Sequence, residues 1–493
     1  MTTTSTASTA APSALQRNAR LLWLLLPRVP LMVGVAVRHA LGLSETSAYL
    51  DLRSALTVAV IRSVLEPDPA RPESISAVQR RTRQDAGVSG RIWVSTYASP
   101  PPPEDGARDA LAAAFGSLLQ GDGGEAERQP MTVPEYAHVE AEWTGYRAGA
   151  RPGEAAPAGL SERDKYEALT GECRHPETTV LYFHGGAYFL MDPASHRPTT
   201  NRLAKLTGGR CYSVRYRLAP AHVFPAALLD ALVSYLTLLY PPRGAFHEPV
   251  RPEHIVFSGD SAGGNLSLAL LQLLLELRRR DASVVWHGAA RAVPLPAAVA
   301  CNSPWMDLTH SSPAFDGPLP AVFDYLPKPS ATARSPPAPC GLWPADPPRK
   351  YLYVGRAALA AHPLVSPLVA AAWHGAPPVY LCAGWELLAW EVRFAAAALA
   401  RQGVRVVYEE YEAMPHCFAL VLTHTPSARR CFDSWAAFIR SAVDDPSAIQ
   451  SAASAIDATS LRQYPLRFDH LADVSHADVC RRVALKAAET ARL

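Results

Sequence analysis

A glycine-rich turn between a strand-like run and a helix-like run constrains this chain more than any other feature. The run His254–Gly259 (HIVFSG) has the length and apolar content of a buried strand, and Asn265–Arg280 is strongly apolar over the length of a helix. Between them lies the motif GDSAG at residues 259–263. A G-x-S-x-G turn in this setting bends sharply and presents its serine hydroxyl above the edge of a sheet. We therefore predict that Ser261 is a nucleophile rather than an ordinary helix-capping serine.

The other residues of this turn are also those that a nucleophilic serine at position 261 requires. Side chains at Gly259, Gly263 or Gly264 would collide with the neighbouring strand and helix, so glycine is required there. Asp260 and Ala262 complete the motif, and the helix N-terminus behind the serine favours developing negative charge.

Strand-like and helix-like segments alternate through residues 178–443, which predicts a mostly parallel sheet covered by helices on both faces. The expected strands are Thr178–His184, Cys211–Tyr216, His254–Gly259, Ala297–Cys301, Val379–Ala383 and Val404–Tyr411. The expected helices are Pro225–Tyr240, Asn265–Arg280, Glu386–Gln402 and Ser427–Val443. The Pro-rich stretch 311–350 breaks the alternation and is predicted to be an inserted loop over one edge.

Composition excludes several classes of function. The 47 basic and 45 acidic side chains nearly cancel and form no basic stripe, so we do not expect nucleic-acid binding. The eight cysteines form neither a C-x-x-C pair nor a Cys/His spacing typical of zinc sites. We therefore infer neither a disulfide framework nor a structural metal.

A second glycine motif, HGGA at residues 184–187, follows directly on a predicted strand. Acyl transfer passes through a tetrahedral oxyanion, which needs two or more N–H donors aimed at it. A Gly-Gly turn can present such backbone N–H groups. The expected donors are Gly185, Gly186 and Ala262, and we expect His184 to brace the turn rather than to act as a base.

The base should follow the serine and the acid in the chain, in a loop beyond a strand. His416, within the sequence MPHCF, comes just after the last predicted strand and is the predicted general base. The alternative for His416 itself is a solvated loop histidine. His424 competes with it but falls within a predicted helix.

The acid must reach the imidazole nitrogen that faces away from the serine. Glu386 lies just past the strand Val379–Ala383 and is the predicted acid, although a glutamate in the first turn of a helix is its simpler interpretation. Glu391, about one helical turn further, is the alternative. Three weaker alternatives are Glu409, Glu410 and Glu412.

Three motifs together resemble the hormone-sensitive-lipase-like branch of the α/β-hydrolase fold: HGGAY at 184–188, YRLAP at 216–220 and GDSAGGN at 259–265. The resemblance covers roughly Thr178–Val443. It implies an α/β-hydrolase fold with an N-terminal helical cap, and carboxylester hydrolysis without metal or cofactor. Residues from Leu21 to about Tyr146 are similar, more narrowly, to fungal members of this branch, some of which resemble steryl acetyl hydrolases of the endoplasmic reticulum membrane.

The sequence departs from the family pattern at three places. Ala187 replaces the third glycine of the first motif, which keeps the N–H but makes the turn less free. Ala221 and His222 follow YRLAP where the family usually has glutamate. The acid motif, typically Gly-x-x-Asp-x-Leu-x-Asp-Glu, reads GWELLAWE at residues 384–391.

The N-terminal apolar run, Leu21–Val37, is interrupted by Pro27, Arg28 and Pro30 and is short for a membrane-spanning helix. It could anchor the chain, lie in the membrane surface with arginines such as Arg28 facing anionic lipid, or cover the acyl pocket. We therefore expect membrane association, with the endoplasmic reticulum suggested by the fungal resemblance alone and a cytoplasmic location as the alternative.

These observations divide the chain into five parts. They are a disordered N-terminus at 1–20, an apolar helical segment at 21–66, cap and early strands at 67–175, the catalytic core at 176–445 and a C-terminal extension at 446–493.

The expected function is that of a serine carboxylesterase or deacetylase acting on hydrophobic, sterol-like or lipid esters. A lipase or lactonase is an alternative. So is a non-catalytic binding module, as in the plant gibberellin receptor, which uses this fold with a damaged triad. The presence of a serine, a carboxylate and a histidine favours the enzyme.

Overall fold

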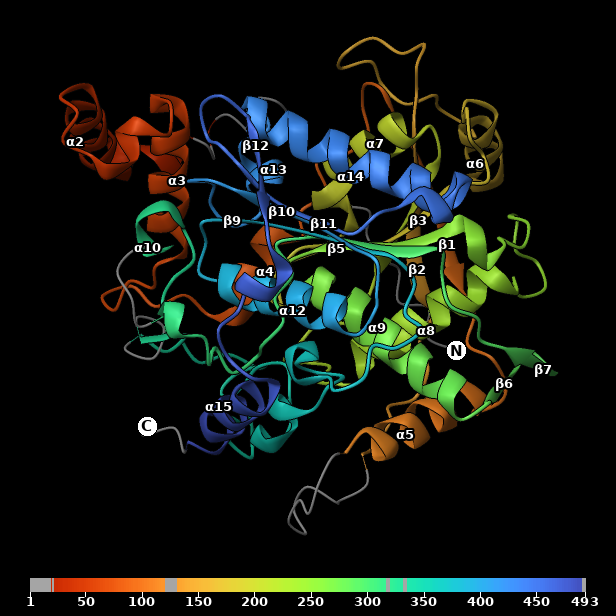
Figure 1. Cartoon of the computed structure of the whole chain (residues 1–493). Helices are drawn as coiled ribbons and strands as arrows, with labels where there is room; N and C mark the ends of the chain where they lie inside the picture. Colours follow the sequence, from red (N-terminus) through yellow and green to blue (C-terminus); the bar gives the residue numbers. More distant parts are fainter. Residues whose placement is uncertain (1–18, 20–21, 120–130, 316–319, 331–334, 490–493) are drawn as a thin grey trace.

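The computed structural model describes residues 19, 22–119, 131–315, 320–330 and 335–489. The disordered N-terminus expected over residues 1–20 therefore lies, apart from residue 19, outside the described residues. A ten-stranded sheet crosses the molecule in the order β1-β2-β4-β3-β5-β8-β9-β10-β11-β12 (Figure 1). Its strands are β1 Ile92–Ser99, β2 Val139–Tyr146, β3 Thr179–Phe183, β4 Arg210–Arg215, β5 Ile255–Asp260, β8 Ala298–Asn302, β9 Val379–Gly384, β10 Val406–Tyr411, β11 Ala452–Ile456 and β12 Gln463–Leu466.

The seven central strands, β4, β3, β5, β8, β9, β10 and β11, run parallel to one another, whereas β1, β2 and β12 pair antiparallel with their neighbours. The predicted mostly parallel α/β-hydrolase sheet is thus confirmed. A separate two-stranded ribbon consists of β6 Ser283–Trp286 and β7 Ala289–Ala292.

Helices cover both faces of this sheet, which explains why its strands are apolar without alternation (Figure 1). One face carries α7 Pro193–Thr207, α13 Phe418–Val421 and α14 Pro426–Asp444, and the other carries α8 Ala226–Leu239, α9 Ala262–Arg279 and α12 Ala389–Arg401. The two faces form separate apolar clusters: in β3, Val180 and Tyr182 pack with Trp435 of α14, and Leu181 and Phe183 pack with residues of α9.

The other helices lie around this core. They are α2 Val29–Ala40, α3 Leu52–Leu65, α4 Ile75–Thr82, α5 Gly106–Leu118, α6 Glu162–Gly171, α10 Pro320–Phe323 and α15 His476–Ala488. Short 3-10 turns are η1 Leu26–Arg28, η2 Glu45–Ala48, η3 Pro252–His254, η4 Pro313–Phe315, η5 Ala357–Ala361, η6 Pro367–Val369, η7 Pro446–Ala448 and η8 Phe468–His470.

The C-terminal extension expected at 446–493 contributes two strands to the ten-stranded sheet. Strand β11 pairs in parallel with β10, and β12 closes that edge. On the helical side, Val479 and Val483 of α15 are buried in the same apolar cluster as α9 and α12. The sequence of β11, AASAI, has only one residue type that is common in strands, Ile456, and its pairing with the neighbouring strands decides its conformation.

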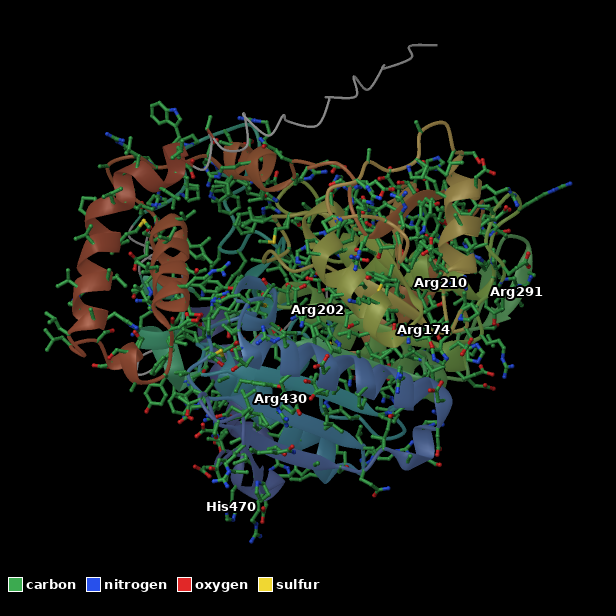
Figure 2. The ribbon with its side chains drawn as sticks, turned by 90° about the horizontal axis from the view of Figure 1, so that it is seen from above. Arg174, Arg202, Arg210, Arg291, Arg430 and His470 are labelled. Atoms are coloured by element: carbon green, nitrogen blue, oxygen red, sulfur yellow. The ribbon has the colours of Figure 1, made fainter. Side chains whose placement is uncertain are left out.

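The apolar helical segment predicted at 21–66 forms a hairpin of α2 and α3, which lie side by side at one end of the molecule (Figures 1 and 2). The helical stretch Leu22–Ala40 has 19 residues, is long and apolar enough to cross a membrane, and has none of its residues buried. Helix α3 instead buries Ser54, Ala55 and Val58.

Candidate active site

Ser261 occupies the sharp turn between β5 and α9. Its backbone has φ 51° and ψ −119°, a left-handed conformation that is strained for a serine and requires support from its surroundings. The support comes from the end of β8 and the loop after it, since the Ser261 N–H donates to Asn302 O at 3.1 Å and the Ser261 carbonyl accepts from Trp305 N at 3.0 Å. The turn therefore holds the serine at the carboxyl end of β5.

The glycines of this turn are required by close backbone contacts, as the sequence predicted. A Cβ on Gly259 would lie 2.5 Å from the carbonyl oxygen of Phe183, and one on Gly263 would overlap that same carbonyl. A Cβ on Gly264 would lie 2.7 Å from Pro304 Cβ. Strand β3 and helix α9 can pack this closely only without side chains at these positions.

Glu386 and His416 are in direct contact, although they follow different strands. Glu386 lies beyond β9 and His416 beyond β10, and Glu386 Oε1 is 3.1 Å from His416 Nδ1. Both side chains are buried. Burial lowers the pKa of His416, but the charge and hydrogen bond of Glu386, together with the charges of Asp324 and Asp260, outweigh it, so that this pKa is raised above 6.5. This contact favours a proton on Nδ1 and leaves Nε2 free to accept one.

Two alternatives from the sequence lie elsewhere. Glu391 Oε1 accepts from Met306 N at 3.1 Å, and burial raises the Glu391 pKa well above its usual value. His424 Nε2 lies 3.2 Å from Ser54 Oγ of α3. The expectation that His424 lies within a helix is wrong, because the chain turns between α13 and α14 at that point.

The three weaker acid candidates also have other partners. Glu409 accepts from the hydroxyls of Tyr380 at 2.9 Å and Tyr411 at 2.8 Å. Glu410 pairs with Arg393, and Glu412 accepts from Ala458 N at 3.1 Å.

The loop that carries His416 reaches the residue before the serine. Cys417 Sγ lies 3.9 Å from Asp260 Oδ2 and 3.4 Å from His416 Nε2. Within the described residues, the Ser261 hydroxyl makes no hydrogen bond to His416. Catalytic contacts are often long in an uncomplexed enzyme and tighten when substrate binds.

The loop after β3 has three consecutive residues with positive φ: Gly186 at 105°, Ala187 at 50° and Tyr188 at 63°. The carbonyl of Gly186 accepts from Phe189 N at 3.0 Å and Leu190 N at 2.8 Å, which closes the turn. Glycine is needed at 186 because a Cβ there would lie 2.5 Å from Leu190 O.

This turn changes the predicted set of oxyanion donors. The N–H of Gly185 already donates to Asp260 Oδ1 at 3.3 Å, so Gly185 links the two glycine motifs instead. Within the described residues, the N–H groups of Gly186, Ala187 and Ala262 have no protein acceptor. Ala187, which keeps its N–H at the third glycine position of the motif, therefore joins Gly186 and Ala262 as a candidate donor. The contact between Gly185 and Asp260 has no local sequence signal.

His184 and Asp260 lie beneath this turn. His184 Nδ1 is 2.7 Å from Gly185 O, and its ring stacks on Tyr216 with the ring centroids 4.3 Å apart. Burial lowers the pKa of His184 to about 3, so it is neutral at ordinary pH. Burial also opposes ionisation of Asp260, but His196 at 3.3 Å and the Tyr182 hydroxyl at 2.6 Å keep the Asp260 pKa below its usual value.

Sequence reasoning missed two polar residues at the acid and base loops. Ser303, at the end of β8, donates to Glu386 Oε2 at 2.7 Å and accepts from Cys417 N at 3.1 Å. Asp324 accepts from His416 N at 3.1 Å and from Leu387 N at 2.8 Å. Asp324 belongs to the Pro-rich stretch that was predicted only as a loop over one edge.

Comparison with known proteins gives matches to this same region. The profile of a family described as alpha/beta hydrolase fold matches residues 180–336 and 337–420. The chain is 32% identical over 273 residues to an acetyl-hydrolase of Streptomyces hygroscopicus, covering 55% of this chain and 78% of that protein. It is 31% identical over 275 residues to the carboxylesterase/phospholipase LipF of Mycobacterium tuberculosis, covering 54% of this chain and 63% of LipF.

A solved structure shows the same fold. The crystal structure of EstE5 soaked with p-nitrophenyl butyrate aligns with a TM-score of 0.50 at 22% identity, covering 78% of this chain and 98% of EstE5.

Proposed function

Since this chain belongs to the α/β-hydrolase-fold family of carboxylic ester hydrolases, we propose that it is a serine carboxylesterase that hydrolyses hydrophobic esters through an acyl-enzyme on Ser261. The single observation that carries this proposal is the buried contact of Glu386 with His416, next to the strained turn that presents Ser261. A non-catalytic binding module would have no need of an oriented histidine at this place.

The proposed reaction has two halves. Ser261 Oγ attacks the ester carbonyl while His416 Nε2 takes its proton, and the oxyanion accepts hydrogen bonds from Gly186, Ala187 and Ala262. His416 then protonates the departing alcohol, which leaves an acyl-enzyme. Water, deprotonated by His416, repeats the attack, and the collapse of the second intermediate returns the proton to Ser261 and releases the acid.

Aromatic side chains near the serine and histidine support a hydrophobic substrate. The backbone N–H of Trp305 donates to Ser261 O at 3.0 Å, and the ring of Tyr325 lies 6.1 Å from that of His416. The Streptomyces relative is named as an acetyl-hydrolase. We therefore propose acetyl and other short acyl esters of hydrophobic alcohols, acetylated sterols among them, as the substrate class.

The test is a panel of p-nitrophenyl esters of increasing acyl length, run beside an acetylated sterol and a lactone. We expect kcat/KM to be highest for short acyl chains, with release of acetate from the sterol ester. Highest activity on long acyl chains would favour a lipase, activity on the lactone alone would favour a lactonase, and binding without turnover would favour the non-catalytic module.

The hairpin of α2 and α3 supports a place for this reaction at a membrane surface. In the helical stretch Leu22–Ala40, which contains α2, Trp23 is 81% exposed and Leu26 71%. The expectation that Arg28 faces anionic lipid is wrong: its guanidinium turns toward α3 and donates to Ser63 Oγ at 2.7 Å and Leu24 O at 2.6 Å. The Arg28 charge is therefore turned away from the exposed apolar side of this helical stretch, where it would oppose insertion into a membrane surface.

We predict that the full-length protein binds vesicles of phosphatidylcholine and phosphatidylserine and that replacing Trp23 and Leu26 by glutamate weakens this binding at least about ten-fold. Burying each apolar side chain contributes about 1.5–3 kcal/mol, which the charge removes. The matched control replaces Tyr464 and Leu485, which are 50% and 62% exposed elsewhere on the surface. A chain that starts at Ser44 should also bind less.

Two results of vesicle sedimentation would argue against membrane binding through α2: full-length protein that stays in solution, or a double-glutamate variant that sediments as before. The relatives described above are bacterial, so the endoplasmic reticulum stays a prediction of the fungal resemblance alone.

A further inference from the structure

Asp324 is a buried carboxylate that accepts four backbone N–H groups. Oδ1 accepts from Tyr325 N at 2.8 Å, Leu326 N at 3.3 Å and His416 N at 3.1 Å, and Oδ2 accepts from Leu387 N at 2.8 Å. The side chain is 1% exposed. An acceptor with this many donors fixes the position of every segment that donates to it.

Two of these segments carry the proposed acid and base. Leu387 directly follows Glu386, and the His416 N–H belongs to the base itself. The two loops leave different strands, β9 and β10, and one carboxylate from a third segment joins their backbones. The distance between Glu386 and His416 therefore depends on a residue that belongs to neither loop.

The segment of Asp324 is in turn held by the N-terminal hairpin. Arg62 of α3 donates through Nε to the carbonyl of Asp324 at 2.9 Å and through a terminal nitrogen to the carbonyl of Val322 at 2.9 Å. Phe323, between them, packs edge-on against Trp385 beside the acid, with the ring centroids 5.5 Å apart. Tyr49, ahead of α3, packs against both rings.

We propose that Asp324 is a positioning residue of the active site, which holds the Glu386 and His416 loops in register, and that Arg62 makes this register depend on the α2–α3 hairpin. The proposal rests on the proposed esterase function. It gives the hairpin a role in catalysis besides membrane contact, since α3 holds the segment that aligns the proposed base with its acid.

The same placement gives Asp324 an electrostatic effect on His416. The ionisable groups that face His416 are Glu386 from the β9 loop, Asp324 and Tyr325 from the α10 segment, Asp260 from β5, and Cys417 beside it. Burial raises the pKa of Asp324, and His416 opposes that shift. When Asp324 is ionised, its charge raises the pKa of His416, whose neutral form is the base.

The test compares Asp324→Asn with Asp230→Asn, using p-nitrophenyl acetate. Asparagine puts an NH₂ group where one of the two segments needs an acceptor, so we expect kcat to fall about 10- to 100-fold with KM nearly unchanged. Removing the charge lowers the His416 pKa, so the acid limb of the pH–kcat/KM profile should move to lower pH. The control residue Asp230 lies in α8, away from the triad, and is an equally buried carboxylate that accepts a hydrogen bond from Arg217 N at 2.8 Å. Its variant should keep the wild-type pH profile.

Arg62 is tested in parallel. Arg62→Ala should lower kcat about 3- to 10-fold, less than the Asp324 variant, because Arg62 contacts the segment of Asp324, which in turn contacts the loops of Glu386 and His416. Arg62→Lys keeps a hydrogen-bond donor and should recover part of the loss. Kinetic values are compared only for variants with wild-type circular dichroism.

Hydrogen exchange provides a readout that does not need activity. Asp324→Asn should raise amide exchange in residues 385–388 and 412–418, and Asp230→Asn should not. Unchanged exchange there, or a loss of activity with an unshifted pH profile, would overturn the positioning role. If neither the wild type nor Asp230→Asn hydrolyses an ester, the proposed function fails instead, and hydrogen exchange alone decides the role of Asp324.

Discussion

Ser261→Ala is expected to lower kcat for ester hydrolysis by about a million-fold, which is the scale on which removal of a nucleophilic serine acts elsewhere. The hydroxyl is the only atom group lost, and the backbone strain at φ 51° lies in the turn rather than in the side chain. The variant should therefore fold normally. What activity is left would come from the oxyanion donors and from substrate binding.

A fluorophosphonate probe gives the direct measurement. Mass spectrometry of the labelled protein should find the adduct on Ser261 and at no other serine. Ser234→Ala is the matched control, since Ser234 is a buried helical serine whose Oγ donates to Asp230 O at 2.8 Å in α8. It should keep full labelling and turnover. Labelling that persists in Ser261→Ala would refute the nucleophile assignment.

Glu386→Gln is expected to lower kcat about 10⁴-fold while leaving the fold intact. The amide cannot carry the charge that stabilises the imidazolium, and it can hold the wrong tautomer of His416. The pH profile should change as well. The base must be neutral, so activity rises with pH through the His416 pKa, which is raised above 6.5 in the wild type, with Glu386 making the largest raising contribution. In the variant this limb should move to lower pH.

Glu391→Gln is the control for this acid. Its burial already raises the pKa of Glu391 well above the usual value, and a glutamine oxygen can still accept from Met306 N. We expect the kcat of Glu391→Gln to stay within a few-fold of the wild-type value. The measurement is the turnover of p-nitrophenyl acetate across the pH range. If Glu391→Gln is the damaging change and Glu386→Gln is not, the acid has been assigned one helical turn too early.

Local sequence predicted the parts of the site that depend on nearest neighbours in the chain. The turn at Ser261 requires glycines between an apolar strand and an apolar helix, and each of these features is written within about ten residues of the serine. The acid and base followed from the rule that catalytic loops come after strands. Their contact was expected from chain order, and the structure brings Glu386 and His416 to 3.1 Å.

Pairings across the chain were not predictable in this way. Gly185 looked like an oxyanion donor, but β3 and β5 lie side by side and bring Asp260 to its N–H, which leaves Ala187 available in its place. Apart from Ile456, strand β11 consists of small residues, and it forms a strand through its pairing with β10 and β12.

The sequence by itself thus determined the sheet of parallel strands and the identity of the proposed nucleophile, base and acid, because these depend on local apolar patterns and backbone freedom. Only the tertiary structure decided which groups hold them in place. Asp324 acts on backbone N–H groups 63 and 92 residues away, and Arg62 on a carbonyl 262 residues away. A backbone N–H or carbonyl is the same at every residue, so no sequence pattern shows which one a side chain will meet.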